Sequence, residues 1–355
     1  MAVRRVNLGN TMLTLLAAIL LAMPVITSQN QRLLHTLIMT GLAIILATSN
    51  RLVYLTGLVH FGHIAFYAMG AYTAALLVTK LDVSFWFAFP IAGVLAGTIA
   101  LAFAAATSKV KGFYFTLLTL AFVEVVRLTI TFAPALGAAF AMKCPPPNPI
   151  TIPHLFTIGF ATRVEYYYFV LVLLAIMLVV LYLIENSRVG AALSAIAQSE
   201  PLAESIGINA TRHKVLTFST CAVFAGLAGA FYAPYAKVIG PSNFTVLASV
   251  IIWFQIVVGG AGSFWGPVIG AVSLVFLREY LPGTGAIKNI YYAVAVLAAV
   301  FFLPGGLVSL PRVVRQKGSK GMVALRLREK LSRRVCASLV ARRKKQGGSG
   351  DTASR

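Results

Sequence analysis

The sequence predicts an all-α, polytopic membrane protein with about ten transmembrane or partly membrane-embedded helices. Of its 355 residues, 59% are apolar and only 11% are charged, whereas soluble domains carry about 25% charged residues. Several apolar runs also reach the roughly 20 residues that cross a hydrocarbon layer of about 30 Å. The composition therefore excludes an ordinary cytosolic protein.

Apolar run lengths and helix-breaking residues divide the chain into ten expected spans. The N-terminal run follows Arg4 and Arg5, and we expect it to be a retained first helix because no small-x-small cleavage site follows it. The expected spans are 11–27, 32–49, 52–79, 84–107, 112–133, 167–184, 214–235, 247–258, 264–280 and 288–303.

Two of these spans are interrupted by glycine. The run 52–79 is too long for one crossing and the run 247–258 is too short. Backbone freed by a helix break in a membrane must be satisfied by protein or water, so we expect both breaks to lie beside cavities, as in repeat-built transporters. The same glycines would also permit tight helix packing. The helix-break candidates are Gly57, Gly62, Gly259, Gly260, Gly262 and Gly266.

The distribution of Lys and Arg sets the expected orientation. An even number of spans places both termini on the same side of the membrane. Residues 312–355 hold 14 basic and 2 acidic residues, so we expect that side to be cytoplasmic. The expected organisation is a transmembrane domain over 1–311 and a basic cytoplasmic tail over 312–355. The tail is either an interfacial helix over 321–345 that binds anionic membrane lipids or a disordered extension, and nucleic-acid binding is not expected.

One acidic residue lies deep in the fifth expected span. Glu124 is 12 residues past Gly112, which at about 1.5 Å per residue places it about 18 Å into the membrane. A charge at that depth is costly unless it faces protein, water or an opposite charge, and Arg127 shares its helix face. The pair either lines a translocation path, holds two moving helices together, or forms a static ion pair within the bundle.

Two histidines flank Gly62 in the first break. His60 and His63 are candidates for the translocation path, or for hydrogen bonds that join helices. Because they have no carboxylate or thiol neighbours, the two histidines are only weak evidence for metal binding, and we expect no metal site. The three cysteines form neither a CxxC pair nor a recognisable disulfide framework.

A loop of 30 residues, 185–214, separates the sixth and seventh spans and is longer than a connection requires. Its Ala-rich stretch 191–198 predicts a short helix ended by Pro201, and a second turn runs through Glu204 to a cap at Gly207. Two short helices outside the bilayer would form a docking surface. The alternative is an ordinary connection that lies on the membrane.

Four segments carry a family resemblance. Gly62–Tyr72, Lys111–Arg127, Ser187–Asn209 and Gly259–Gly270 occur in this order. Together they resemble segments of LivM-type permeases, the membrane subunits of branched-chain amino acid ABC importers. The resemblance covers most of residues 50–310 and leaves out the basic tail.

The resemblance implies a permease subunit of the bacterial inner membrane with four kinds of partner: a LivH-like permease subunit, two cytoplasmic ATPase subunits, an external substrate-binding protein and membrane lipids. The chain has no GxxxxGK[ST] phosphate loop, so it is expected to bind no cofactor and to be no enzyme, with ATP used by the partner subunits. The loop 185–214 would couple to the ATPases. Its candidate residues are Arg188, Gly190, Glu200, Glu204 and Gly207.

Departures from the family pattern leave the solute open. Ala191, Ser194 and Ala197 stand where the family commonly carries basic residues, and residues 144–149 replace a glycine-rich stretch. His60 replaces a small polar residue. The cargo is therefore either a branched-chain amino acid or another small molecule such as urea or an amide.

Two other classes of protein compete with this interpretation. An ion-coupled secondary transporter would use Glu124 as a proton or sodium site and would work without ATPase subunits. An integral membrane enzyme would need clustered nucleophiles or metal ligands, and the sequence has none that are recognisable.

Overall fold

The computed structural model describes residue 23 and residues 30–110, 112–136, 141–152, 156–160, 162–282, 285–302 and 305–309. Apart from residue 23, the expected first span 11–27 lies outside the described residues, as does the basic tail 312–355 with its expected helix at 321–345. The chain divides into two units, Met1–Leu307 and Val308–Arg355. The description below concerns the first unit.

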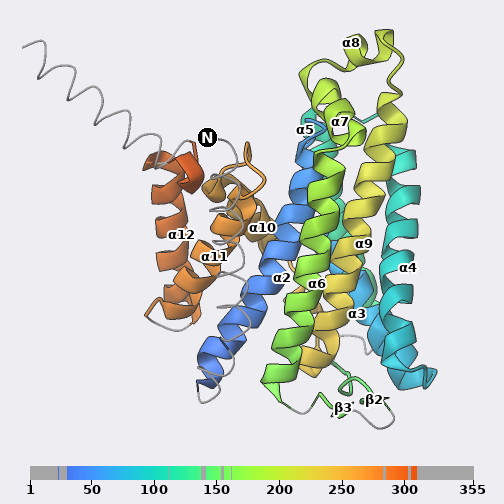
Figure 1. Ribbon diagram of the computed structural model, residues 1–355, viewed down its shortest axis with the longest axis vertical. Helices are drawn as coiled ribbons and strands as arrows, with labels where there is room; N and C mark the ends of the chain where they lie inside the picture. Colours follow the sequence, from blue (N-terminus) through green and yellow to red (C-terminus); the bar gives the residue numbers. More distant parts are fainter. Residues whose placement is uncertain are drawn as a thin grey trace, which may run out of the picture. The chain divides into compact units, whose positions relative to one another are not determined.

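The described part of this unit is helical apart from a few short strands (Figure 1). Its α-helices are α2 (Gln31–Tyr54), α3 (His63–Lys80), α4 (Phe85–Thr107), α5 (Gly112–Phe132), α6 (Arg163–Glu185), α7 (Arg188–Gln198), α8 (Glu200–Ser205), α9 (Ala210–Ala236), α10 (Val246–Gly259), α11 (Gly266–Tyr280) and α12 (Gly285–Phe302). Single 3-10 turns occur at η1 (Pro134–Leu136), η2 (Pro241–Asn243) and η3 (Leu307–Ser309).

Four short strands form two antiparallel pairs. β1 (Met142–Lys143) pairs with β4 (Val238–Ile239), with Met142 opposite Ile239. β2 (Ile150–Ile152) pairs with β3 (Phe156–Ile158) in a hairpin. β2 and β3 lie at the end of the long helices opposite to α8 (Figure 1).

Among the described residues, six helical segments are long and apolar enough to cross a membrane: α2, α4, α5, α6, α9 and the segment Pro241–Gly259 that contains α10. This confirms the predicted all-α, polytopic membrane fold. The predicted start of the third span is wrong, because residues 52–54 end α2 instead of opening that span, and α3 begins only at His63. The apolar run continues through Leu52, Val53 and Tyr54 and gives no boundary signal.

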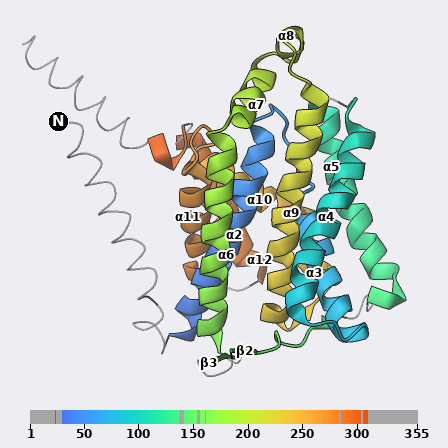
Figure 2. The same cartoon turned by 45° about the vertical axis from the view of Figure 1, so that its right-hand side comes forward.

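α2 is the most deeply buried of these spans, with 72% of its most apolar stretch buried against 28% for α5 and for α6. It packs against α6, α9, α10 and α11 (Figure 2). Its buried hydroxyls bond to carbonyls of their own helix, for example Thr40 Oγ1 to Thr36 O at 2.7 Å and Ser49 Oγ to Ile45 O at 2.7 Å. These hydroxyl groups of α2 can therefore lie inside the bundle with their donors satisfied.

Small residues bring α4 and α9 close together. Ala88, Ala92, Ala96 and Ala100 recur every four residues on α4 and are fully buried. Such a stripe lets helix backbones approach closely in a membrane, and Ser219 of α9 donates a 2.7 Å hydrogen bond to the Gly97 carbonyl of α4. α3, α4 and α9 consequently form one tightly packed layer.

The loop between β1 and α6 holds a buried thiol. Cys144 is 4% exposed, and its backbone N–H bonds to the Lys237 carbonyl at 2.8 Å. Burial raises the pKa of this thiol to about 12, so it stays protonated and unreactive at neutral pH.

Candidate functional site

The first break occupies residues 55–62, between α2 and α3. Gly57 has a φ of +80°, a conformation that other residues rarely adopt. Two threonines of α5 satisfy backbone groups freed by the break: Thr116 Oγ1 donates to the Val59 carbonyl at 2.8 Å, and Thr119 Oγ1 accepts from the Phe61 N–H at 3.1 Å. The exposed backbone is thus paired by side chains of a neighbouring helix, as a break within a membrane requires.

His60 and His63 are 2% and 1% exposed. Their rings lie 5.7 Å apart, and the His60 ring lies 4.9 Å from that of Phe218 on α9. His63 Nε2 shares a 2.8 Å hydrogen bond with Ser49 Oγ of α2, whereas both nitrogens of His60 lack a partner among the described residues. Gly62, between them, precedes α3 directly. The pair joins α2, α3 and α9 inside this one chain.

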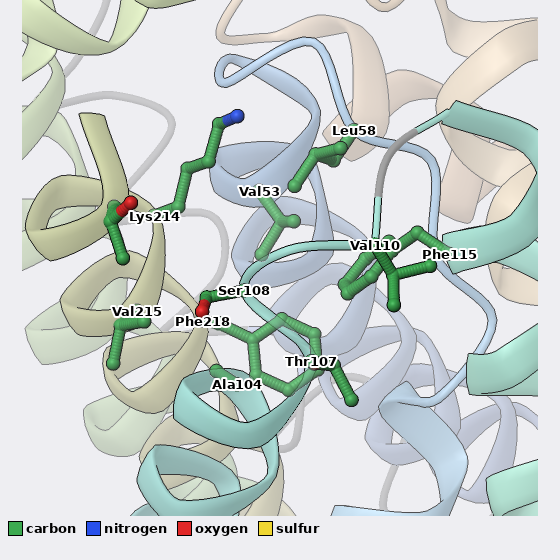
Figure 3. Close-up of a pocket in the computed structure, with 11 residues that line it drawn as sticks. Val53, Leu58, Ala104, Thr107, Ser108, Val110, Phe115, Lys214, Val215 and Phe218 are labelled. Carbon is green, nitrogen blue, oxygen red and sulfur yellow. The ribbon is translucent and has the colours of Figure 1, made fainter.

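A small cavity lies below this break, where α2, α4, α5 and α9 meet. Its volume is about 20 Å³, roughly the space of one water molecule. Figure 3 shows Val53, Val110, Phe115 and Phe218 around it, while the Lys214 side chain extends its amine away from Phe218. The bundle is therefore closed to solutes at this point.

The helices α7 and α8 project beyond one end of the long helices (Figure 1). α7 begins at Arg188 and ends at Gln198, and Pro201 lies in the first turn of α8. The predicted helix over 191–198 does end at Gln198, before Pro201, although it begins three residues earlier than expected. Proline is well placed at the start of the second helix. Gly207 follows α8 with a φ of +89°.

This two-helix loop carries exposed apolar residues away from the membrane spans. Leu202 and Ile206 are 66% and 70% exposed, and Glu204 beside them is also exposed. The loop is nevertheless held firmly to the bundle: Glu200 pairs with Lys214 of α9 at 2.9 Å, and Gly190 is buried against the end of α6. It forms an ordered surface with uncovered apolar side chains.

The first break touches this loop directly. A Cβ at Gly57 would lie 3.3 Å from the Cα of Ala197, in the last turn of α7. A displacement of α7 would therefore press on the break itself, because closely packed atoms transmit displacement.

Arg51 ties three parts of the chain together. Its guanidinium makes two hydrogen bonds to the Glu185 carboxylate at the end of α6, of 2.5 and 2.9 Å, and its Nε donates to the Ala261 carbonyl at 2.9 Å. The Arg51 side chain is 4% exposed and that of Glu185 is 22% exposed. This arginine joins the end of α2 to the base of the two-helix loop and to the second glycine break.

This pairing could not be predicted from the sequence. Arg51 is not among the predicted site residues and Glu185 only opens a predicted loop, because partners 134 positions apart leave no local pattern. One local feature could have pointed to the pair: Arg51 and Glu185 are each a lone charged residue at the end of an apolar run.

The second break, residues 260–265 between α10 and α11, is packed by backbone. A Cβ on Gly259 would lie 1.9 Å from the Gly266 carbonyl oxygen, and a Cβ on Gly266 would lie 1.9 Å from that of Gly260. Gly260 has a φ of +113°, and Gly262 lies in the turn with open space where a Cβ would be. Only glycine allows this contact between chain segments.

Glu124 and Arg127 form an ion pair on α5. Their side chains are 41% and 28% exposed, so the pair lies on a face of α5 that the described part of the chain leaves partly open. The carboxylate and guanidinium partner each other and do not join the histidine pair. Among the described residues, no group of three or more His, Cys, Asp or Glu side chains could hold a metal ion.

Broken membrane helices, an ordered loop outside the spans and a buried charge that links the two are features typical of polytopic membrane transport proteins. Residues 32–304 match the family described as the branched-chain amino acid transport system / permease component. The chain belongs to this family.

Two curated relatives are the high-affinity branched-chain amino acid transport system permease proteins LivM of Salmonella typhimurium and Escherichia coli. The chain is 29% identical to the first over 77% of its own length and 69% of the relative's, and 28% identical to the second over 74% and 66%. The ribose import permease protein RbsC of Escherichia coli is 29% identical over 34% of this chain and 39% of its own. No solved structure matches.

Proposed function

We infer that this chain is one permease subunit of an ABC importer for branched-chain amino acids, and that it forms half of the translocation path. The family match over residues 32–304 carries this inference, together with the exposed apolar residues on the ordered loop α7–α8. The proposed assembly contains a LivH-like permease subunit, two cytoplasmic ATPase subunits and an external substrate-binding protein in the bacterial inner membrane. Both termini and the loop face the cytoplasm.

The loop α7–α8 is the proposed coupling element. When ATP closes the ATPase pair, the docked loop favours one arrangement of the permease helices by differential contact. Two routes lead inward from it: Ala197 presses on Gly57 of the first break, and Glu185 pulls on Arg51. ATP is bound and used by the partner subunits, and this chain acts as the responding element.

Glu124 and Arg127 remain proposed path residues. They lie on a partly open face of α5, which suits either contact with the solute or contact with the partner permease. His60 and His63 are proposed to act at the first break, where the unpartnered imidazole of His60 can gain a hydrogen bond when the break moves.

A second candidate is the same machinery with another small solute. The similarity to a ribose import permease indicates that this architecture can serve different solutes. Urea and amides are the other small solutes that we consider. An ion-coupled secondary transporter is the alternative that lies outside the class of ABC importers.

The coupling role is tested by placing charge on the exposed apolar residues of the loop. Leu202→Asp combined with Ile206→Asp is expected to reduce co-purified ATPase subunits about tenfold while retaining the partner permease, because a desolvated carboxylate opposes docking. The matched control is Val238→Asp, the same kind of change at a 44% exposed valine of β4. Equal ATPase recovery and equal permease-stimulated hydrolysis in all three proteins would remove the loop from the docking surface.

A further inference from the structure

A groove of about 600 Å³ runs between α10 and α12. α12 lies at the edge of the described bundle, where it packs against α10 and α11 (Figure 1). On both helices, residues that line the groove recur at spacings of three and four, so each helix presents one face to it. They include Leu247, Val250 and Phe254 of α10, and Ile290, Ala293 and Leu297 of α12.

The length of the groove matches one leaflet of a membrane. Along α12 it runs from Asn289 to Val300, which are 11 residues apart, or about 16 Å. One leaflet contributes about 15 Å of hydrocarbon, half of a layer of about 30 Å. One extended acyl chain can therefore lie along the whole groove.

The groove has a buried floor as well as exposed walls. Tyr292 and Val296 line it and are 7% and 2% exposed, because they pack with Val258 of α10 and Leu274 of α11 in one apolar cluster. The walls stand open to the surroundings, with Ile290 and Leu297 about 60% exposed. A chain in this hollow touches protein on several sides, whereas a lipid against a flat helix face touches it on one.

Positive charge gathers at one end of the groove. Arg278 and Asn289 line that end. The Arg278 guanidinium lies 6.0 Å from the centre of the Tyr292 ring and has no carboxylate partner in the described part of the chain. Beside Arg278, the Glu279 carboxylate already pairs with Arg32 at 3.2 Å, and the Lys288 amine lies 3.5 Å from the Glu279 carbonyl oxygen.

Three cations thus accompany one carboxylate at this end, an arrangement that attracts an anionic group. A guanidinium can donate two parallel hydrogen bonds to a phosphate, and the Asn289 amide can donate another. The apolar length and the cationic end together match a molecule with a long hydrocarbon chain and an anionic phosphate head.

We propose that this groove binds one anionic phospholipid, which joins α10, α11 and α12. Arg278 receives the phosphate, and one acyl chain lies between the faces of α10 and α12. The site lies at the end of the spans where α2 begins, away from the loop α7–α8. In the orientation proposed above, this end belongs to the external leaflet; only the choice of leaflet rests on the proposed function.

Thermal melts with two lipids test the headgroup contact. The full-length chain is purified in detergent with the subunits that it retains, stripped of lipid and melted with dioleoyl phosphatidylglycerol, which is anionic, or dioleoyl phosphatidylcholine, which has the same chains and no net charge. Phosphatidylglycerol is expected to raise the melting temperature more, because a ligand that binds the folded state stabilises it. Inorganic phosphate at the same concentration is expected to give no shift, because it has no acyl chain.

Arg278→Gln is expected to abolish the difference between the two lipids. It should also lower the phosphatidylglycerol retained after purification about tenfold, measured by mass spectrometry, because a charge-assisted hydrogen bond is lost. Arg163→Gln is the matched control. It removes the same charge from an exposed arginine at the same end of the spans, where Arg163 bonds to the Gln31 carbonyl at the start of α2.

Ala293→Phe tests the apolar part of the site. It places a ring in the groove from an exposed position and leaves Arg278 unchanged, so it should lower the retained phosphatidylglycerol to a similar extent. Ala105→Phe, at an exposed alanine of α4, is its control and should retain the lipid. Size-exclusion profiles and lipid-free melting temperatures equal to wild type show that the variants fold.

Loss of phosphatidylglycerol in Arg278→Gln and Ala293→Phe but not in their controls supports the site. Equal shifts with both lipids, equal retention in all variants, or a shift with inorganic phosphate as large as that with phosphatidylglycerol overturns it. A disulfide cross-link from Val294→Cys to a cysteine scanned along a partner permease helix also overturns it, because protein then fills the groove. None of these measurements uses solute uptake, so the site and the importer function can fail independently.

Discussion

The two glycine-rich breaks share a composition but are built differently. The first is packed by side chains, since Thr116 and Thr119 hold its backbone and two imidazoles fill its interior. The second is packed by backbone, with Gly259 and Gly266 in direct contact. Side-chain hydrogen bonds can exchange partners, whereas interlocked backbones must separate altogether. The first break is thus suited to movement and the second to rigidity.

Arg51 connects these two unlike regions. It bonds to the second break through the Ala261 carbonyl and to the base of the α7–α8 loop through Glu185. The first break begins four residues further along the chain. We therefore expect a movement of the loop to act on the first break while the second serves as its support.

The largest expected effect comes from a side chain placed in the rigid break. Gly259→Ala puts a methyl group 1.9 Å from the Gly266 carbonyl oxygen, and we expect it to lower the free energy of unfolding by about 3 kcal/mol or more. Thermal melts of detergent-purified protein measure this. Gly262→Ala is the control, because that position has open space around it. Equal melting temperatures for the two variants would contradict the interlocked backbone.

The next effect comes from the connection between the breaks. Arg51→Gln leaves Glu185 without its guanidinium and is expected to cost about 2–3 kcal/mol, below the range of fully buried pairs because Glu185 is partly exposed. It should also reduce solute transported per ATP hydrolysed. Adding Glu185→Gln should restore part of the stability, since no lone charge then remains.

Arg32→Gln serves as the comparison for Arg51. It breaks an exposed pair with Glu279, which is expected to contribute below about 1 kcal/mol. If Arg51→Gln and Arg32→Gln had the same effect on stability and coupling, Arg51 would be an ordinary surface charge.

The smallest expected effect is in the flexible break. Thr119→Val removes the acceptor of the Phe61 N–H and should cost about 1 kcal/mol. Thr129→Val, on the same helix, removes only a hydroxyl bond to the Val125 carbonyl within α5 and is the matched control. Hydrogen exchange of the 55–62 backbone should rise in the first variant alone. Unchanged exchange there would mean that α5 does not hold the break.

The lengths of the apolar runs predict where the long helices of the described region lie, but they locate the ends of these helices poorly. α6 begins at Arg163 and α9 at Ala210, each four residues before the predicted start. At α6 the first turn is polar and is stabilised by a capping box between Thr162 and Glu165, which hydropathy does not detect. The glycine breaks were predicted from composition, but not that one is filled by side chains and the other by backbone.

Contacts distant in sequence could not be predicted. The approach of Gly57 to Ala197 and the bond of Arg51 to Ala261 join segments more than 100 residues apart. Gln255 offered a local signal, because it is a lone amide inside an apolar run, but only the packing of α10 shows that its side chain is buried.

We propose that partner ATPases move this chain through the loop α7–α8. Leucine uptake into proteoliposomes measures it directly, with the chain present alone or together with a LivH-like permease, ATPase subunits and binding protein. We expect uptake only in the complete assembly supplied with ATP, and none by the chain alone under a proton or sodium gradient. Uptake by the purified chain alone, driven by such a gradient, would contradict the account.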